Sequence, residues 1–96
     1  MQNAAITKVD KSFVGHIYFS EHDVLTGHVD KVLRLHNLDR ALKLGNLYKR
    51  KVKIIFQNSL SHVLETEATI WAVTENYIML KGGKIIPIRS IMDVIV

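Results

Sequence analysis

The amino-acid sequence predicts an α+β protein in which an N-terminal helical region precedes a five-stranded antiparallel small β-barrel. Between residues 20 and 44, apolar residues recur at spacings of three and four, which is the period of an amphipathic helix. After Asn46 the apolar period becomes two, as in strands that bury one face. Five short strands with close turns favour a closed barrel, because an open sheet exposes an apolar face and two unpaired edges.

The chain has the length and composition of one domain, with 96 residues, 48% of them hydrophobic, and a net charge of +4. We expect a single domain over 1–96, divided into an extended arm with the helical region (1–47) and the barrel (48–96). These values exclude intrinsic disorder. The sequence has no long apolar run and no signal-like start, so we expect a cytoplasmic protein without a membrane segment. Cysteine is absent, which excludes disulfides and thiolate metal sites.

The N-terminal half divides into an arm and a helix. Ala4–Val9 and Ser12–Phe19 are rich in branched and aromatic residues, so a strand or an extended arm is predicted there. Ser20–Leu44 has the helical period, but its two apolar stripes are rotated relative to each other near His36, which predicts a bend or break. Gly45 then predicts the end of the helix, because glycine adopts the left-handed conformation that ends helices.

The second half contains five predicted strands and their turns. Gly82-Gly83 is the clearest hairpin signal, Glu75-Asn76 predicts a tight turn, and Arg89-Ser90 predicts a single helical turn. The predicted strands are Lys51–Phe56, Val63–Val73, Tyr77–Lys81, Lys84–Ile88 and Ile91–Val96.

Trp71 has two interpretations. By strand alternation it shares a side with Glu65 and Glu67, and an exposed indole beside basic strands is suited to stack on a nucleic-acid base. The alternative is burial against the helical region or a second subunit. We favour burial, because the leucine-rich stripes of the helical region need a surface to pack against.

Positive charge is concentrated in the second half. Residues 48–96 contain seven Lys and Arg and four Asp and Glu, and the excess lies mainly in Lys49, Arg50, Lys51 and Lys53. Such a run can meet phosphate groups. The alternative is a solvated strand whose lysines discourage edge-to-edge pairing, with Lys51 and Lys53 as cross-strand partners of glutamates.

The stretch Leu80-Lys-Gly-Gly-Lys-Ile-Ile-Pro-Ile88 resembles the second Sm motif. The order of elements over 48–96 is similar to the Sm-like and SH3-like small barrels. This resemblance implies RNA contacts at Lys81 and Gly82, whereas the turn Val73–Tyr77 has neither the aspartate nor the matching asparagine of the first Sm motif. Leu44–Asn46 and Glu65–Thr74 also resemble a group of short bacterial proteins of unknown function.

Motifs for catalysis are missing from the sequence. It has no glycine-rich phosphate loop, nucleophile elbow or paired-carboxylate motif. The histidines lack the i, i+4 spacing that lets two imidazoles reach one ion. They are His16, His22, His28, His36 and His62. We therefore expect a non-enzymatic protein with no cofactor and no metal; an enzyme would require a pocket that joins Glu65, Glu67 and a histidine.

Two functions follow as predictions. The first is a small-barrel protein that contacts RNA or another nucleic acid through a basic strand face. Its candidate residues are Lys49, Arg50, Lys51, Lys53, Lys81, Gly82, Lys84, Arg89 and Trp71. The alternative is a protein-interaction or self-assembly module, a homo-oligomer with no nucleic-acid ligand, because the helical region has more apolar surface than a small barrel can cover.

Overall fold

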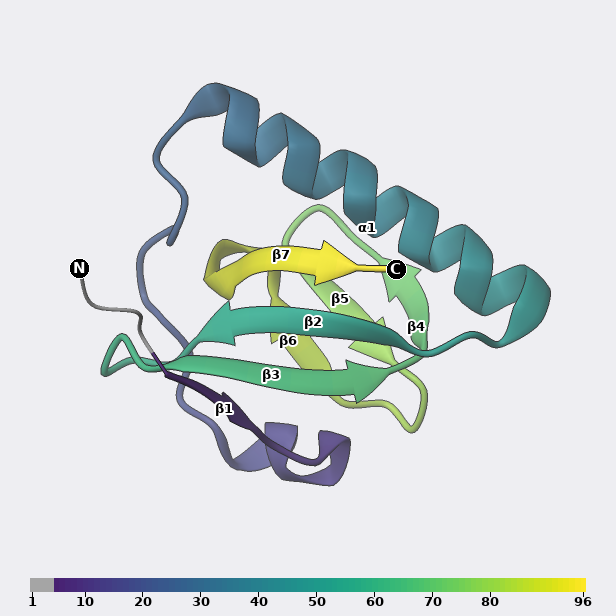
Figure 1. Ribbon diagram of the computed structural model, residues 1–96, viewed down its shortest axis with the longest axis horizontal. Coiled ribbons are helices and arrows are strands. Elements are labelled where there is room, and N and C mark those ends of the chain that lie inside the picture. Colours follow the sequence, from purple (N-terminus) through teal and green to yellow (C-terminus); the bar gives the residue numbers. More distant parts are fainter. Residues whose placement is uncertain (1–4) are drawn as a thin grey trace.

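The computed structural model describes residues 5–96, which form two β-sheets and one long helix (Figure 1). The larger sheet has the strand order β1-β3-β2-β7, with β1 parallel to β3 and the other pairs antiparallel. The smaller sheet, β4-β5-β6, is antiparallel throughout. The strands are β1 (Ile6–Lys8), β2 (Val52–Gln57), β3 (Val63–Ala68), β4 (Ile70–Val73), β5 (Tyr77–Leu80), β6 (Ile85–Pro87) and β7 (Ile91–Ile95).

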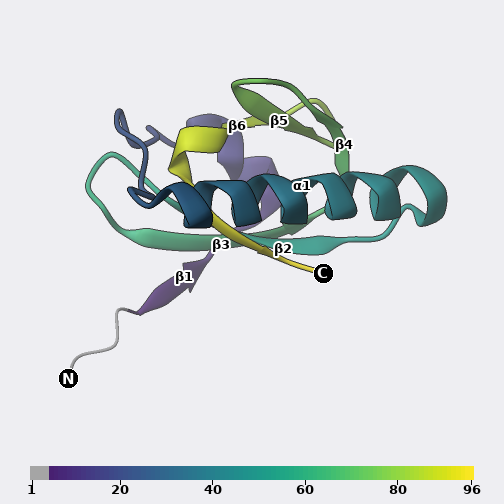
Figure 2. The same cartoon turned by 90° about the horizontal axis from the view of Figure 1, so that it is seen from above.

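Helices fill the space between the edges of the two sheets. The helix α1 (His28–Tyr48) packs against β7 of the larger sheet and β4 of the smaller one (Figures 1 and 2). The 3-10 helix η1 (Lys11–His16) contacts β3 and β6. A second 3-10 turn, η2 (Ile88–Ser90), leads into β7. The core between the sheets therefore includes Val14 from η1 and Leu38 from α1, both fully buried.

The predicted fold class is wrong in two respects. The helix lies in the middle of the chain, after β1 and η1, and residues 5–96 form two separate sheets where a closed five-stranded barrel was expected. The physical reason lies at Thr69, which interrupts the predicted strand Val63–Val73. Ala68, Thr69 and Ile70 are all buried, so the alternation stops there and the chain passes from one sheet to the other. Side chains of α1 and η1 then cover the apolar edges that a closed barrel would have covered with strand pairing.

The predicted helix boundaries are also wrong. Residues 20–27 precede the helix, which is continuous through His36 and ends only at Lys49, a residue with φ 53°. Gly45 lies inside it and is buried. A Cβ atom at this position would clash with the carbonyl oxygen of Ile70, so the glycine permits α1 to approach β4 closely.

Several local predictions are confirmed. In β2, Val52, Ile54 and Phe56 are buried while the flanking lysines are exposed, as the alternation predicted. Gly82 and Gly83 have φ values of 98° and 94°, the left-handed region that favours glycine in hairpins. The helical turn before the last strand and the turn at Glu75-Asn76 are present. In the N-terminal arm, a strand is confirmed at Ile6–Lys8, the segment from Lys11 is a 3-10 helix, and Ala4 lies outside the described residues.

Candidate nucleic-acid interface

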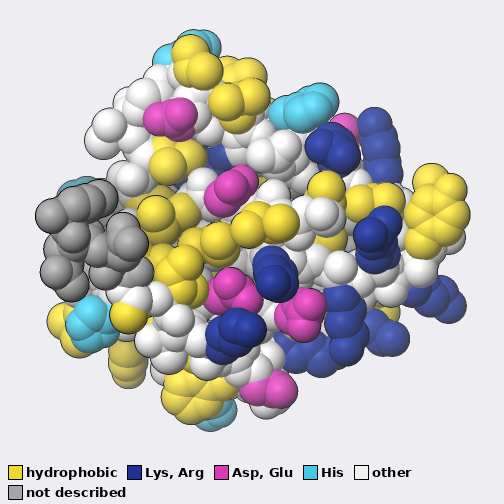
Figure 3. Space-filling view, viewed as in Figure 1, with side chains coloured by type: hydrophobic (Ala, Val, Ile, Leu, Met, Phe, Trp, Pro, Cys, Tyr) yellow, Lys and Arg dark blue, Asp and Glu magenta, His cyan; other side chains and the backbone are white. Residues whose placement is uncertain are grey.

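Positively charged residues from segments far apart in the sequence meet where α1 ends and β2 begins. Lys49, Arg50 and Lys51 follow the last turn of α1, and all three are exposed. Lys53 extends the series on the outer face of β2. In Figure 3, Lys and Arg side chains gather on the side of the molecule where Figure 1 places this junction. We call this region the basic end.

The β5–β6 hairpin brings Lys81 to the basic end. The Lys81 backbone N–H donates a hydrogen bond to the carbonyl oxygen of Thr69 (2.8 Å). The Thr69 hydroxyl donates a longer one to the carbonyl oxygen of Lys49 (3.4 Å). Both lysine backbones therefore contact the same threonine. Gly82 lies beside Lys81 at the tip of the hairpin, and the Lys84 side chain lies against Gly15 of η1, whose Cβ would be 3.2 Å from Lys84 Cδ.

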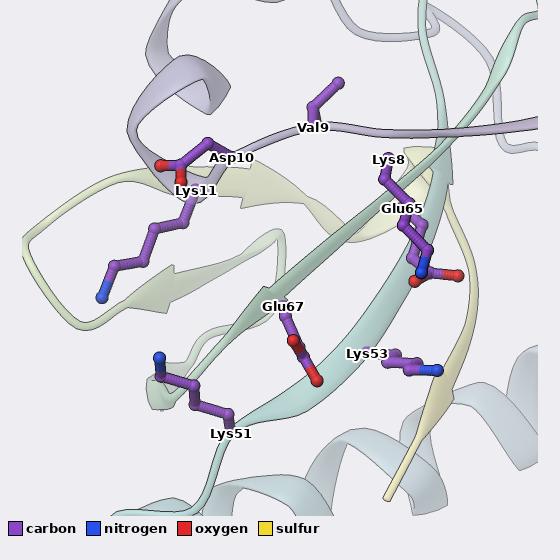
Figure 4. Close-up of a pocket in the computed structure, with 8 residues that line it drawn as sticks. All are labelled: Lys8, Val9, Asp10, Lys11, Lys51, Lys53, Glu65 and Glu67. Carbon is purple, nitrogen blue, oxygen red and sulfur yellow. The ribbon is translucent and has the colours of Figure 1, made fainter.

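Two lysines that sequence reasoning missed, Lys8 and Lys11, also lie near the basic end. They line a hollow of about 490 Å³ on the outer face of the larger sheet together with Lys51 and Lys53 (Figure 4). Parallel pairing of β1 with β3 places Lys8 there, opposite Glu65. The signal for this position is weak, because a strand of three residues carries too little periodicity to indicate its partner.

Carboxylates balance most of the charge inside this hollow. Its lining includes Asp10, Glu65 and Glu67. Glu67 lies directly opposite Lys53, as predicted, whereas Glu65 lies opposite Ile55 and Lys51 precedes the paired residues of β2. The backbone N–H of Ser12 donates a hydrogen bond to Asp10 and lowers the pKa of that carboxyl, with smaller effects from nearby lysines. The hollow has four lysines against three carboxylates and keeps one net positive charge. Lys49, Arg50 and Lys81 add exposed positive charge outside it.

Trp71 is exposed in this chain, so its burial against the helical region is wrong, and its burial against a second subunit stays a prediction. Its exposed fraction is 48%. The pairing of β4 with β5 shifts register between Ile70 and Ala72, so Trp71 is the extra residue of a bulge, a feature that redirects side chains. The residue before it contacts α1 at Gly45. This contact places Trp71 in the strand next to the last turn of the helix, adjoining the basic end.

Arg89 lies apart from the other predicted residues. Its Nε donates a hydrogen bond to the carbonyl oxygen of Ser20 (2.7 Å), and its own carbonyl accepts one from Val24 (2.8 Å). It shares a small hollow with Asp23 and Glu75. In this structure Arg89 holds the segment before α1 in place, and the hollow beside it also contains Arg34, which is paired with Asp23.

The described residues contain neither a grouped set of metal ligands nor a membrane-spanning helix. Among residues 5–96, no three His, Asp or Glu side chains are grouped so that they could hold a metal ion. The described residues that line the hollow with Glu65 and Glu67 include no histidine. No helix within the described part of the chain is long and apolar enough to cross a membrane.

No protein family, curated protein or solved structure matches this chain. The resemblance of residues 48–96 to Sm-like and SH3-like proteins therefore stays a prediction.

Proposed function

We propose that this protein is a non-enzymatic binding protein whose basic end contacts single-stranded RNA or DNA. The observation that carries the proposal is that exposed cations of the segment joining α1 to β2 and of the β5–β6 hairpin lie close together, beside the strand of an exposed tryptophan. The cations supply a sequence-independent attraction for phosphates. The proposal retains the predicted cytoplasmic location.

The proposed mechanism combines phosphate contacts with base stacking. Lys49, Arg50, Lys51 and Lys81 contact consecutive phosphates, and Trp71 stacks on one base. Stacking on an aromatic side chain contributes about 1–3 kcal/mol per base. A single strand is favoured because its bases are free to leave the stack and reach the indole, whereas those of a duplex are paired. We expect little sequence preference, since every base has a face on which an indole can stack.

A titration with matched variants tests this function. Labelled single-stranded RNA and DNA oligonucleotides are titrated with protein at several salt concentrations, and binding is followed by fluorescence anisotropy. Replacing Arg50, Lys51 and Lys81 with glutamine should weaken binding and reduce the slope of log K against log salt by about 2, because each lost phosphate contact on a single strand removes about 0.7. The control replaces Lys31, Arg40 and Lys43 with glutamine, which removes the same charge from exposed positions of α1.

Two results would contradict the proposal. One is the absence of salt-dependent binding by the wild-type protein at micromolar concentrations. The other is an equal loss of affinity in both triple variants, which would indicate attraction to net charge alone. Trp71 is the only tryptophan, so its fluorescence should be quenched on binding; an unchanged emission at saturation would remove stacking from the mechanism.

A further inference from the structure

The helix α1 has more apolar surface than its own fold covers. It buries a narrow stripe formed by Arg34, Leu38, Ala41 and Gly45. Large apolar side chains remain exposed on the rest of the helix. They are Val29, Val32, Leu33, Leu35, Leu47 and Tyr48. Leu33 and Tyr48 differ from the rest, because the first lines a groove and the second forms the tip of the helix.

The groove lies between the N-terminal half of α1 and β7. Leu25, Leu33 and Met92 form its apolar lining, and Asp30 and Asp93 add two carboxylates. Its one cation, Arg34, is already paired with Asp23, which lies outside the lining (2.8 Å). The groove is therefore apolar with a net negative charge. Its volume of about 230 Å³ is below the roughly 300–1,000 Å³ of pockets for small molecules, and suits one large side chain of a partner protein.

The C-terminal tip of α1 is apolar and positively charged, and so complements the groove. Tyr48 is 72% exposed, next to the equally exposed Leu47, and Lys49 and Arg50 follow immediately. A tyrosine anchor with two adjacent cations matches an apolar groove with two carboxylates in size and in charge. The chain cannot fill its own groove, because continuous helix separates Leu33 from Tyr48 by roughly 22 Å at ~1.5 Å per residue.

We propose that the groove beside Leu33 binds the Tyr48 tip of a second copy of this chain. In the complex the Tyr48 ring lies between Leu25, Leu33 and Met92, and Lys49 and Arg50 face Asp30 and Asp93. The two surfaces are different, so the contact is heterologous. Each added copy presents a free groove at one end and a free tip at the other, and the assembly grows as a chain or closes as a ring. High salt should weaken the contact, because its charges lie at the rim.

A mixing experiment with two variants tests this arrangement. Leu33→Glu disables the groove, and Tyr48→Glu disables the tip; both positions are exposed, and circular dichroism verifies that each variant folds. By sedimentation velocity, wild-type protein should form oligomers that grow with concentration, and each variant alone should associate at least tenfold more weakly. An equimolar mixture should give a 1:1 dimer and nothing larger, because only one intact groove and one intact tip remain.

The matched control is Leu35→Glu, since Leu35 is 57% exposed and Leu33 is 52% exposed, but only Leu33 lines the groove. This control should assemble like the wild type. A strictly monomeric wild type, a mixture that stays monomeric, or a symmetric dimer that survives both variants would overturn the proposal. The proposal does not rest on nucleic-acid binding. Lys49 and Arg50 take part in both contacts, but Lys51 and Lys81 belong only to the nucleic-acid contact and Leu33 only to self-association. Variants at these positions therefore distinguish the failure of one proposal from that of the other.

Discussion

At the scale of single residues, Arg34 links three segments of the chain. Its guanidinium donates two hydrogen bonds of 2.8 Å to the carboxylate of Asp23 and one of 3.0 Å to the carbonyl oxygen of Ile91. The side chain is only 6% exposed. These contacts fix the segment before α1, the helix itself and β7 relative to one another, and they neutralise a charge that burial would otherwise make costly.

Removing the Asp23 carboxylate should therefore destabilise the protein in a pH-dependent way. The hydrogen bonds from Arg34 are the main cause that lowers the pKa of Asp23, so its stabilising effect is present at neutral pH and is lost as pH falls below about 4. Asp23→Asn should reduce the free energy of unfolding by about 2–3 kcal/mol at pH 7. The difference from the wild type should narrow at pH 3, as urea denaturation at both values will show. A difference that stays constant with pH would contradict this role of the ion pair.

The contacts of Arg34 could not be predicted from the sequence, and the exposure of Trp71 was one of two interpretations that the sequence allowed. Arg34 interrupts an otherwise apolar helical stripe, and its acceptors are 11 residues before it and 57 after it. No local pattern indicates partners at such separations. Trp71 follows three buried residues at a register shift, and a bulge is decided by strand pairing. Strand alternation continued from Glu65 and Glu67 also places Trp71 on the exposed side, but in the structure the bulge determines its orientation.

At the scale of elements, α1 and the two sheets differ in how far local signals determine them. The hairpin at Gly82-Gly83 was predictable, because only glycine adopts positive φ there without strain. The length of α1 was not predictable, because the sequence does not distinguish a glycine that ends a helix from one, such as Gly45, that permits close packing. The strand break at Thr69 was equally hidden, because threonine favours strands and the change of sheet depends on what is buried around it.

Gly45→Ala tests the contact between α1 and β4. Alanine is the better helix former by about 1 kcal/mol, but its Cβ would clash with the backbone oxygen of Ile70, which cannot move without disturbing β4. We expect a net destabilisation of about 1–3 kcal/mol, measured by thermal or urea unfolding. The control, Asn46→Ala, changes the next residue, which is exposed, and should leave stability equal or slightly higher. A more stable Gly45→Ala protein would show that the glycine is not needed for packing.

At the scale of the whole molecule, the N-terminal arm is part of the core. Val14 is fully buried in the cluster that both sheets share, and β1 adds an edge to the larger sheet. The arm should therefore unfold together with the rest of the protein. The grouping of the lysines is also a property of the whole molecule. The run from Lys49 to Lys53 was visible in the sequence, whereas the positions of Lys81, Lys8 and Lys11 depend on contacts between segments far apart in the chain.

Val14→Ala measures how strongly the arm is coupled to the sheets. The lost apolar volume should reduce the free energy of unfolding by about 2 kcal/mol. Trp71 fluorescence reports on the smaller sheet, and far-ultraviolet circular dichroism reports on the whole fold, so their urea transitions should coincide in a single step. Exposed Phe13→Ala, next to Val14 in η1, should have a smaller effect. Two separate transitions would show that the arm is an independent appendage.

The position of α1 between β7 and β4 has a consequence for how the protein is made. During synthesis the helix leaves the ribosome well before either strand that it packs against. β4 emerges first, but the buried stripe is not fully covered until β7 has emerged, because β7 also packs on the helix and supplies the carbonyl of Ile91 to Arg34. The nascent helix therefore carries its apolar stripe in water, open to chaperones or to premature aggregation, while translation continues.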